Sequence, residues 1–81
     1  MANSEVGELI QSIVEEIVDN PDDVNITETE EDRTTTIEVS TAKEDVGKVI
    51  GKKGAMAKAL RTICSSISGK RDHRYMVLIK E

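Results

Sequence analysis

The sequence predicts an α+β domain with the element order α-β-β-α-α-β, a three-stranded mixed sheet and helices packed on one face. Apolar residues recur at helical spacing near the N-terminus and again in the second half of the chain. Elsewhere they alternate with polar residues, as strands require. At 81 residues the chain has room for one compact core, so we expect a single domain over residues 1–81.

A first helix is predicted over residues 4–19. Asn3 or Ser4 would supply the N-cap, and Pro21 would prevent the helix from continuing. Its polar face carries glutamates and an aspartate, which would repel phosphate, so we expect a scaffold helix. The apolar stripe consists of Val6, Leu9, Ile10, Ile13, Val14, Ile17 and Val18.

A β-hairpin is predicted over residues 24–40, with strands at 24–29 and 34–40 and a turn at 30–33. Both strands alternate β-branched or apolar residues with polar ones. One side of the hairpin should face the helices, and the other side is rich in threonine. The inward residues would be Val24, Ile26, Thr35, Ile37 and Val39.

A short second helix is predicted over residues 43–50. Thr41 and Glu44 have the spacing of a capping box. Gly47 lies inside this helix, where a glycine costs about 1 kcal/mol relative to alanine. It either allows close approach of a backbone or ligand, or is a glycine that a short helix tolerates.

A third helix is predicted over residues 54–68, ending at Gly69. Cys64 belongs to its apolar stripe and is expected to be a buried small hydrophobic residue, not a nucleophile. The remaining core residues of this helix would be Met56, Ala59, Leu60, Ile63 and Ile67.

The last strand is predicted over residues 74–80. Its odd-numbered apolar residues, Tyr75, Val77 and Ile79, should face inward. Met76 and Leu78 then lie on the polar side of the sheet. An exposed apolar pair there indicates a partner surface, although scattered exposed apolar residues are also ordinary.

Charge is distributed unevenly along the chain, whose net charge is -5. Residues 1–42 hold one basic residue against twelve acidic ones, a balance of -11, whereas residues 43–81 hold ten basic against four acidic, a balance of +6. The second half could form a basic surface for nucleic acid, or the chain could simply place a solvated acidic helix beside a solvated basic one.

The candidate site is the loop Gly51-Lys52-Lys53-Gly54 between the second and third helices. Without Cβ atoms, the two glycines can adopt positive φ and allow a ligand backbone to approach. The lysines would meet a phosphate as point charges, and amides at the start of the next helix would donate to it. The pattern by itself fits either a phosphate-binding loop or a tight turn, and its context must decide between the two.

The run from Asp45 to Gly54, set between two helices and flanked by strands, resembles the signature of a KH domain of the bacterial type II arrangement. The resemblance covers nearly the whole chain, and the small single domain is similar to the bacterial KhpA family. Membership would imply a single-stranded RNA-binding protein, acting as an RNA chaperone or post-transcriptional regulator. It would also imply pairing as a homodimer, or as a heterodimer with a larger KH/Jag-type protein.

The resemblance implies that the loop contacts the phosphates of about four unpaired nucleotides. The last strand and its loop would form the far wall of the groove. Without Phe or Trp, and with Tyr75 inward, affinity should be modest and sensitive to salt. The RNA-binding residues would be Gly51, Lys52, Lys53, Gly54, Val46, Lys48, Ile50, Met56, Lys58, Arg61 and Arg74.

Other functions fit the sequence less well. The lysine-rich loop has one residue too few between its glycines for a P-loop and lacks the Ser/Thr that holds magnesium. A helix-hairpin-helix would not have strands on both sides of the motif. One His and one Cys form neither a zinc site nor a catalytic pair, so we expect no enzyme activity, metal or cofactor.

Two further expectations concern location and partners. No run of about 18 apolar residues and no signal-peptide layout occurs, so we expect a cytoplasmic protein without membrane association. The alternative function is a protein-interaction module that partners a larger KH/Jag-type RNA-binding protein and has little direct RNA contact. The two lysines of the loop favour direct RNA contact.

Overall fold

The fold follows the predicted order of elements. In the computed structural model, which describes residues 3–81, the helices are α1 (Glu5–Ile17), α2 (Val46–Ile50) and α3 (Ala55–Arg71). The strands are β1 (Asn25–Glu31), β2 (Thr34–Ser40) and β3 (Arg74–Ile79). Short 3₁₀ turns precede β1, α2 and α3: η1 (Pro21–Asp23), η2 (Lys43–Asp45) and η3 (Lys52–Gly54). Residues 1 and 2 of the predicted domain lie outside the described residues.

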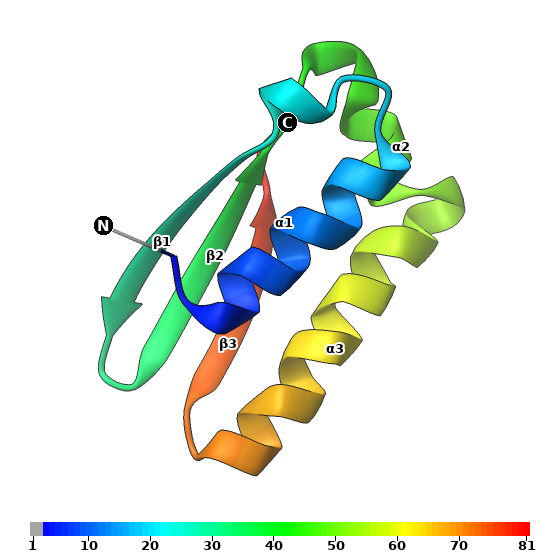
Figure 1. The fold of residues 1–81 in the computed structure, drawn as a ribbon. Helices are drawn as coiled ribbons and strands as arrows, with labels where there is room; N and C mark the ends of the chain where they lie inside the picture. Colours follow the sequence, from blue (N-terminus) through cyan, green and yellow to red (C-terminus); the bar gives the residue numbers. More distant parts are fainter. Residues whose placement is uncertain (1–2) are drawn as a thin grey trace.

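The three strands form one sheet in the order β1-β2-β3. β1 pairs antiparallel with β2, whereas β2 and β3 are parallel because α2 and α3 carry the chain back across the sheet. Figure 1 shows α1 and α3 side by side on one face of the sheet. The prediction of a mixed three-stranded sheet with helices on one face is therefore confirmed.

The core lies between this face and the two long helices. Ile37 pairs with Val77 across β2 and β3, and both are buried. Ile10 and Leu60 are fully buried, one from each long helix. Thr35 is also buried, as the alternation of β2 predicts. Burial of this apolar set supplies the main stabilising free energy of a domain of this size.

Two residues predicted for the core are exposed. Leu9 lies at the edge of the α1 stripe and is 43% exposed. Ala59 of α3 faces solvent, whereas Ala57 is buried. The prediction for Ala59 was wrong because the buried stripe of α3 is centred on Ala57, Leu60 and Cys64, and Ala59 lies outside it.

The N-terminus of α1 is fastened to β1 by a shared carboxylate. Ser4 is the N-cap, and its Oγ accepts a hydrogen bond from the amide of Gly7 at 3.0 Å. Glu28 of β1 accepts from the amide and the Oγ of Ser4, at 2.8 Å and 3.0 Å. A carboxylate at a helix N-terminus also interacts favourably with the helix dipole.

The hairpin turn is tighter than the sequence predicts. Both strands continue to Glu31 and from Thr34, so only Asp32 and Arg33 form the turn. Their φ angles of 49° and 61° are those of a type I′ turn, which matches the twist of the strands. The sequence hides this turn because Arg33 stands where such turns usually have glycine.

The expected capping box before α2 is absent. Thr41 Oγ1 donates to the carbonyl of Ala42, and no side chain caps η2 or α2. The chain instead enters α2 through the 3₁₀ turn η2, so the α-helix proper begins at Val46 rather than at residue 43.

α3 also ends later than predicted. Gly69 is part of the helix, which runs to Arg71. The left-handed residue that ends the helix is Asp72, with φ 52° and ψ 39°, and aspartate is one of the few residues other than glycine that tolerate this conformation. Because β3 begins at Arg74, the predicted loop is only Asp72 and His73.

Candidate nucleic-acid interface

The glycine loop, residues 51–54, holds its backbone in conformations that few residues adopt. Gly51 has φ 80° and ψ 171°, a region open essentially to glycine alone. A Cβ on Gly51 would lie 2.7 Å from the Met56 amide nitrogen. Gly54 has φ 77° and ψ 12°. Between them, Lys53 has a positive φ of 57°, a strained conformation of the kind that concentrates at functional sites.

The loop leaves donors at the start of α3. Gly54 is the N-cap of this helix, no side chain accepts from its first amides, and its first turn holds no acidic residue. The Gly54 and Ala55 amides already donate to the carbonyls of Gly51 and Lys52 inside the loop. The amides that follow them in the first turn lack partners within the helix and carry the positive end of its dipole. Lys52 and Lys53 are exposed beside these amides. An anion placed at the loop would therefore meet oriented donors and two positive charges.

Lys48, a predicted phosphate contact, already has a partner. Its Nζ lies 3.1 Å from Oδ2 of Asp19, in the segment that follows α1. The hydrogen bond with Asp19, together with the charges of Asp45 and Glu44, raises the pKa of Lys48 against the opposing effect of desolvation. Lys48 would have to leave Asp19 to hold a phosphate fully.

A buried carboxylate positions α2 ahead of the loop. Asp45 is fully buried, and it accepts hydrogen bonds from the amides of Asp19 and Asn20 and from Asn20 Nδ2. Burial alone would raise the pKa of Asp45, but these hydrogen bonds and the charge of Lys48 outweigh it and lower the pKa. Sequence reasoning missed this residue, because Asp45 lay inside the helix predicted over residues 43–50 and its local sequence does not mark it as an anchor to a distant segment.

The other predicted residues near the loop are divided between core and surface. Val46, Ile50 and Met56 are half-buried, so they form the base of the loop and leave part of their surface for a ligand. Lys58 is exposed on α3. Gly47 is exposed, and a Cβ there would meet nothing within 4 Å, so packing within the described chain does not require a glycine.

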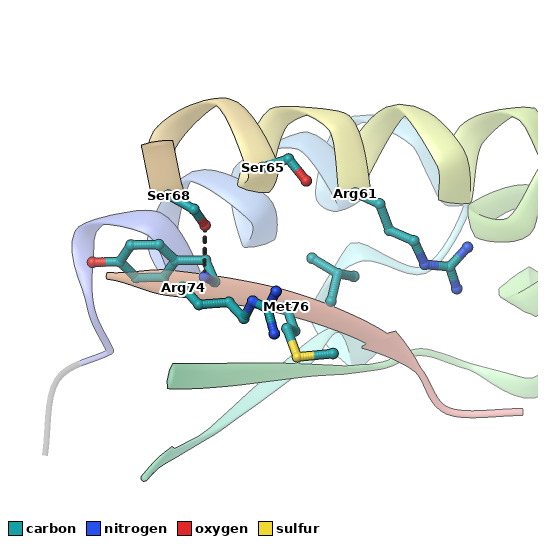
Figure 2. Close-up of a pocket in the computed structure, with 7 residues that line it drawn as sticks. Arg61, Ser65, Ser68, Arg74 and Met76 are labelled. Carbon is teal, nitrogen blue, oxygen red and sulfur yellow. Dashed lines mark hydrogen bonds between the residues drawn. The ribbon is translucent and has the colours of Figure 1, made fainter. Parts of the chain in front are cut away.

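A groove of about 530 Å³ lies between the later turns of α3 and β3. Figure 2 shows Arg61 and Ser65 extending from the helix and Arg74 and Met76 from the strand. We call this the α3–β3 groove. None of its lining residues comes from the glycine loop, which lies at the opposite end of α3. They are Arg61, Ser65, Ser68, Arg74, Tyr75, Met76 and Val77.

The arginine side chains differ in whether they are paired. Arg71 lies 3.3 Å from Glu5, and Arg33 lies 3.1 Å from Asp72, so both join existing ion pairs. Arg61 and Arg74 form no ion pair with any of residues 3–81, and both line the α3–β3 groove. Their charge is therefore available to a ligand in the groove.

Sequence reasoning identified Arg61 and Arg74 but not the rest of the groove. Ser68 closes one end: its Oγ accepts from the Tyr75 amide and donates to the Cys64 carbonyl, each at 2.8 Å. Met76 was assigned to the outer face of the sheet, yet at 49% exposure it also borders the groove. The alternation of residues along a strand assigns each side chain to one face of the sheet, so it does not show that a side chain at the sheet edge also borders a groove.

The remaining features of the chain concern its cysteine, metal binding and membrane spans. Cys64 is buried, and desolvation raises the pKa of its thiol. Residues 3–81 contain no cluster of His, Cys, Asp or Glu arranged for a metal ion. In the same range, no helix has both the length and the apolar character needed to span a membrane.

Comparisons with known proteins identify a family that this chain resembles over most of its length. The family model of the KhpA/KhpB KH domain matches residues 7–79. A protein of Listeria monocytogenes named RNA-binding protein KhpA is 47% identical, over 91% of this chain and 97% of its own length. Proteins of the same name from Caldanaerobacter subterraneus and Aquifex aeolicus are 42% and 40% identical, over 91% and 96% of this chain and 99% of their own lengths. No solved structure matches significantly.

Proposed function

The chain belongs to the KhpA/KhpB family of KH domains, a family of RNA-binding proteins and not of enzymes, and on that premise we propose that it binds single-stranded RNA through the glycine loop. The observation that carries the proposal is the backbone of residues 51–54. Positive φ angles at Gly51, Lys53 and Gly54 place two exposed lysines beside the uncapped start of α3. This arrangement suits a phosphate group.

The neighbouring contacts support the same proposal. Asp45 and Lys48 contact Asp19 and Asn20, in the segment that follows α1. These contacts hold in place the helix that precedes the glycine loop. The relatives from Listeria monocytogenes and Aquifex aeolicus are also named as RNA-binding proteins. Phosphate contacts carry no sequence information, and the one aromatic residue of Phe, Tyr and Trp type, Tyr75, is half-buried. We therefore expect weak, salt-sensitive binding that tolerates many sequences.

The test is fluorescence anisotropy of short unstructured RNA. The double change Lys52→Asp and Lys53→Asp reverses the charge at the loop and should abolish binding while leaving the fold intact. For a matched control, Lys53→Asp alone is compared with Lys43→Asp, which reverses one exposed lysine before α2. Equal binding by the double variant and the unchanged protein would refute the proposal.

A competition experiment separates unpaired from paired RNA. A KH groove requires splayed bases, so a duplex should displace single-stranded RNA poorly. Efficient displacement by a duplex would instead support a helix-hairpin-helix mode of phosphate binding.

We extend the proposal to an RNA chaperone or post-transcriptional regulator that acts as a pair. Phosphate contacts that are weak and independent of sequence would let the protein bind many transcripts and dissociate from them readily. The observation that favours pairing is the apolar pair Met76 and Leu78, 49% and 51% exposed on β3. The pair would be a homodimer or a heterodimer with a larger KH/Jag-type protein.

The same apolar pair favours a second candidate, an interaction module that partners a larger RNA-binding protein with little RNA contact of its own. The two candidates differ in what the isolated chain does. Loss of a partner interaction in Leu78→Thr, combined with no RNA binding by the unchanged chain, would support the interaction module.

A further inference from the structure

We infer that Asp19 is a positioning residue that limits RNA affinity by holding Lys48 in an ion pair. The glycine loop then binds phosphate with two lysines, Lys52 and Lys53, and not with three. This inference rests on the proposed RNA-binding function. It concerns a residue of the acidic half of the chain, to which the proposed function assigns no role.

Lys48 lies close enough to the glycine loop to contact a phosphate there. It stands three residues before Gly51, which is about 4.5 Å along the axis of a helix. The Gly51 amide donates to the carbonyl of Gly47 at 2.9 Å, so the helical turn that contains Lys48 leads directly into the loop. The flexible four-carbon stem of a lysine spans such a distance. Because Lys48 is exposed, burial does not fix where its charge lies.

The partner of Lys48 comes from the other half of the chain. Lys48 Nζ lies 3.1 Å from Asp19 Oδ2. Figure 1 shows the C-terminal end of α1 beside α2, and Asp19 follows that end. Within residues 3–81, neither Lys52 nor Lys53 forms an ion pair. Of these three lysines, only Lys48 therefore has its charge compensated inside the described part of the chain.

The backbone of Asp19 is held in place, which favours the ion pair. The buried carboxylate of Asp45 accepts from the Asp19 amide at 3.2 Å and from the Asn20 amide at 3.0 Å. Asp45 therefore fixes the backbone of Asp19 beside the helical turn that carries Lys48. Because this backbone is already ordered, forming the pair costs less conformational entropy than joining two mobile segments would.

Other carboxylates also act on Lys48. The hydrogen bond and charge of Asp19 are the main causes of the raised pKa of Lys48, and the charges of Asp45 and Glu44 act in the same direction. A phosphate at the loop would therefore compete with three carboxylates for this ammonium group. The side chains of the pair are 45% and 73% exposed, and exposed ion pairs contribute modestly. The expected effect on affinity is thus a few-fold change and not an all-or-none switch.

Two simpler roles for Asp19 lead to different expectations. An ion pair that only supports the fold would affect stability and leave RNA binding unchanged. A carboxylate that only repels RNA at a distance would act equally whether or not Lys48 is present, because such repulsion needs no contact. Release of Lys48 to a phosphate, in contrast, requires both residues.

The test measures the binding of short unstructured RNA by fluorescence anisotropy at two salt concentrations. Asp19→Asn should bind about fivefold more tightly at about 50 mM salt and about twofold more tightly at about 200 mM, because one more neutralised phosphate steepens the salt slope by about 0.7. Asp22→Asn removes an exposed carboxylate of η1, three residues further along the chain, and is the matched control. It should leave the salt slope unchanged.

A double-mutant cycle shows whether Asp19 acts through Lys48. Lys48→Gln removes the ammonium group and keeps a good helix former. In the Lys48→Gln background, Asp19→Asn should no longer steepen the salt slope and should tighten binding no more than Asp22→Asn does. Thermal unfolding without RNA provides a second readout. Asp19→Asn should lower the midpoint slightly while it tightens RNA binding, a combination that a purely structural role does not produce.

The outcomes separate this inference from the proposed function. Unchanged RNA affinity and salt slope in Asp19→Asn, with binding still abolished by Lys52→Asp and Lys53→Asp, would overturn the inference and leave the proposed function intact. Equal tightening by Asp19→Asn with and without Lys48 would also overturn it, in favour of repulsion at a distance. No binding of any RNA, by the unchanged protein or by Asp19→Asn, would refute the proposed function itself.

Discussion

Asp45 Oδ2 accepts hydrogen bonds from both the backbone amide and the side-chain Nδ2 of Asn20, each at 3.0 Å. The two residues are 25 positions apart in the sequence: Asn20 follows α1, and Asp45 immediately precedes α2. Because α2 leads directly into the glycine loop, this contact sets where the loop lies relative to the rest of the domain.

Replacing Asp45 by asparagine should lower the free energy of unfolding by about 1–3 kcal/mol, because the new amide group would point donors at the donors of Asn20. Urea unfolding followed by circular dichroism measures the change. Asp22→Asn, at an exposed aspartate of η1, is the control and should have little effect. Equal stability of Asp45→Asn and the unchanged protein would show that the contact contributes nothing.

The same carboxylate predicts a pH dependence. The pKa of Asp45 is lowered below its ordinary value near 3.8, so its charged form stabilises the fold at any pH above that value. This contribution is lost as the pH falls from 3.8 through the lower pKa of the folded state. The stability difference between the unchanged protein and Asp45→Asn should be constant at neutral pH and shrink in acid. A difference that grew as the pH fell would contradict the sign.

The two glycines of the loop should respond differently to substitution. Gly51→Ala combines a backbone region closed to other residues with a 2.7 Å contact to Met56, so it should destabilise the protein by about 1–3 kcal/mol and weaken RNA binding. Gly54→Asn should be mild, because asparagine tolerates the left-handed conformation and a Cβ there has open space. Thermal unfolding and anisotropy of both variants test this contrast. Equal losses of stability and RNA affinity in the two variants would mean that the backbone angles of Gly51 and Gly54 do not determine how each position responds to substitution.

The helical glycines Gly47 and Gly69 provide a second matched pair. A Cβ added at either position would meet no atom within 4 Å, so alanine at either should stabilise the fold by up to about 1 kcal/mol. Thermal unfolding measures this gain. If a phosphate backbone approaches α2 closely, only Gly47→Ala will also weaken RNA binding. Unchanged RNA affinity in Gly47→Ala would favour the simpler interpretation of a tolerated glycine.

Leu78 provides the test of pairing. Leu78→Thr introduces a β-branched residue suited to a strand but removes an apolar side chain that is 51% exposed. If β3 forms the contact between copies, sedimentation should show a dimer for the unchanged chain and a monomer for the variant. Thr27→Ser, on the same face of the sheet, is the control. A monomer for the unchanged chain at high concentration would refute homodimerisation.

Periodicity predicted which elements exist, but less about where they end. The α1 stripe and the alternation of β2 are strong signals because each side chain faces either core or solvent in a regular repeat. The end of α3 was missed because glycine usually stops a helix, whereas here Asp72 adopts the left-handed conformation instead of Gly69. The turn at Asp32 and Arg33 was predicted too long for the same reason, because positive φ occurs there at residues other than glycine.

The candidate site was predictable in part. Gly51 to Gly54 are contiguous, so the sequence shows them together, and Arg61 lies on the helix that follows. The meeting of Arg61 with Arg74 depends on α3 lying against β3, with Ser68 bonded to the Tyr75 amide. The pairing of Lys48 with Asp19 likewise depends on how α1 and α2 meet. Sequence spacing contains neither relationship.

By itself the sequence determined the order of elements, the faces of the strands and the glycine loop, because these follow from local backbone preferences and from periodic burial. Only the tertiary structure decided which charges are already paired, which carboxylate holds α2 in place and which side chains share the α3–β3 groove. Those features depend on contacts between residues far apart in the chain, and such contacts exist only once helices and sheet have packed together.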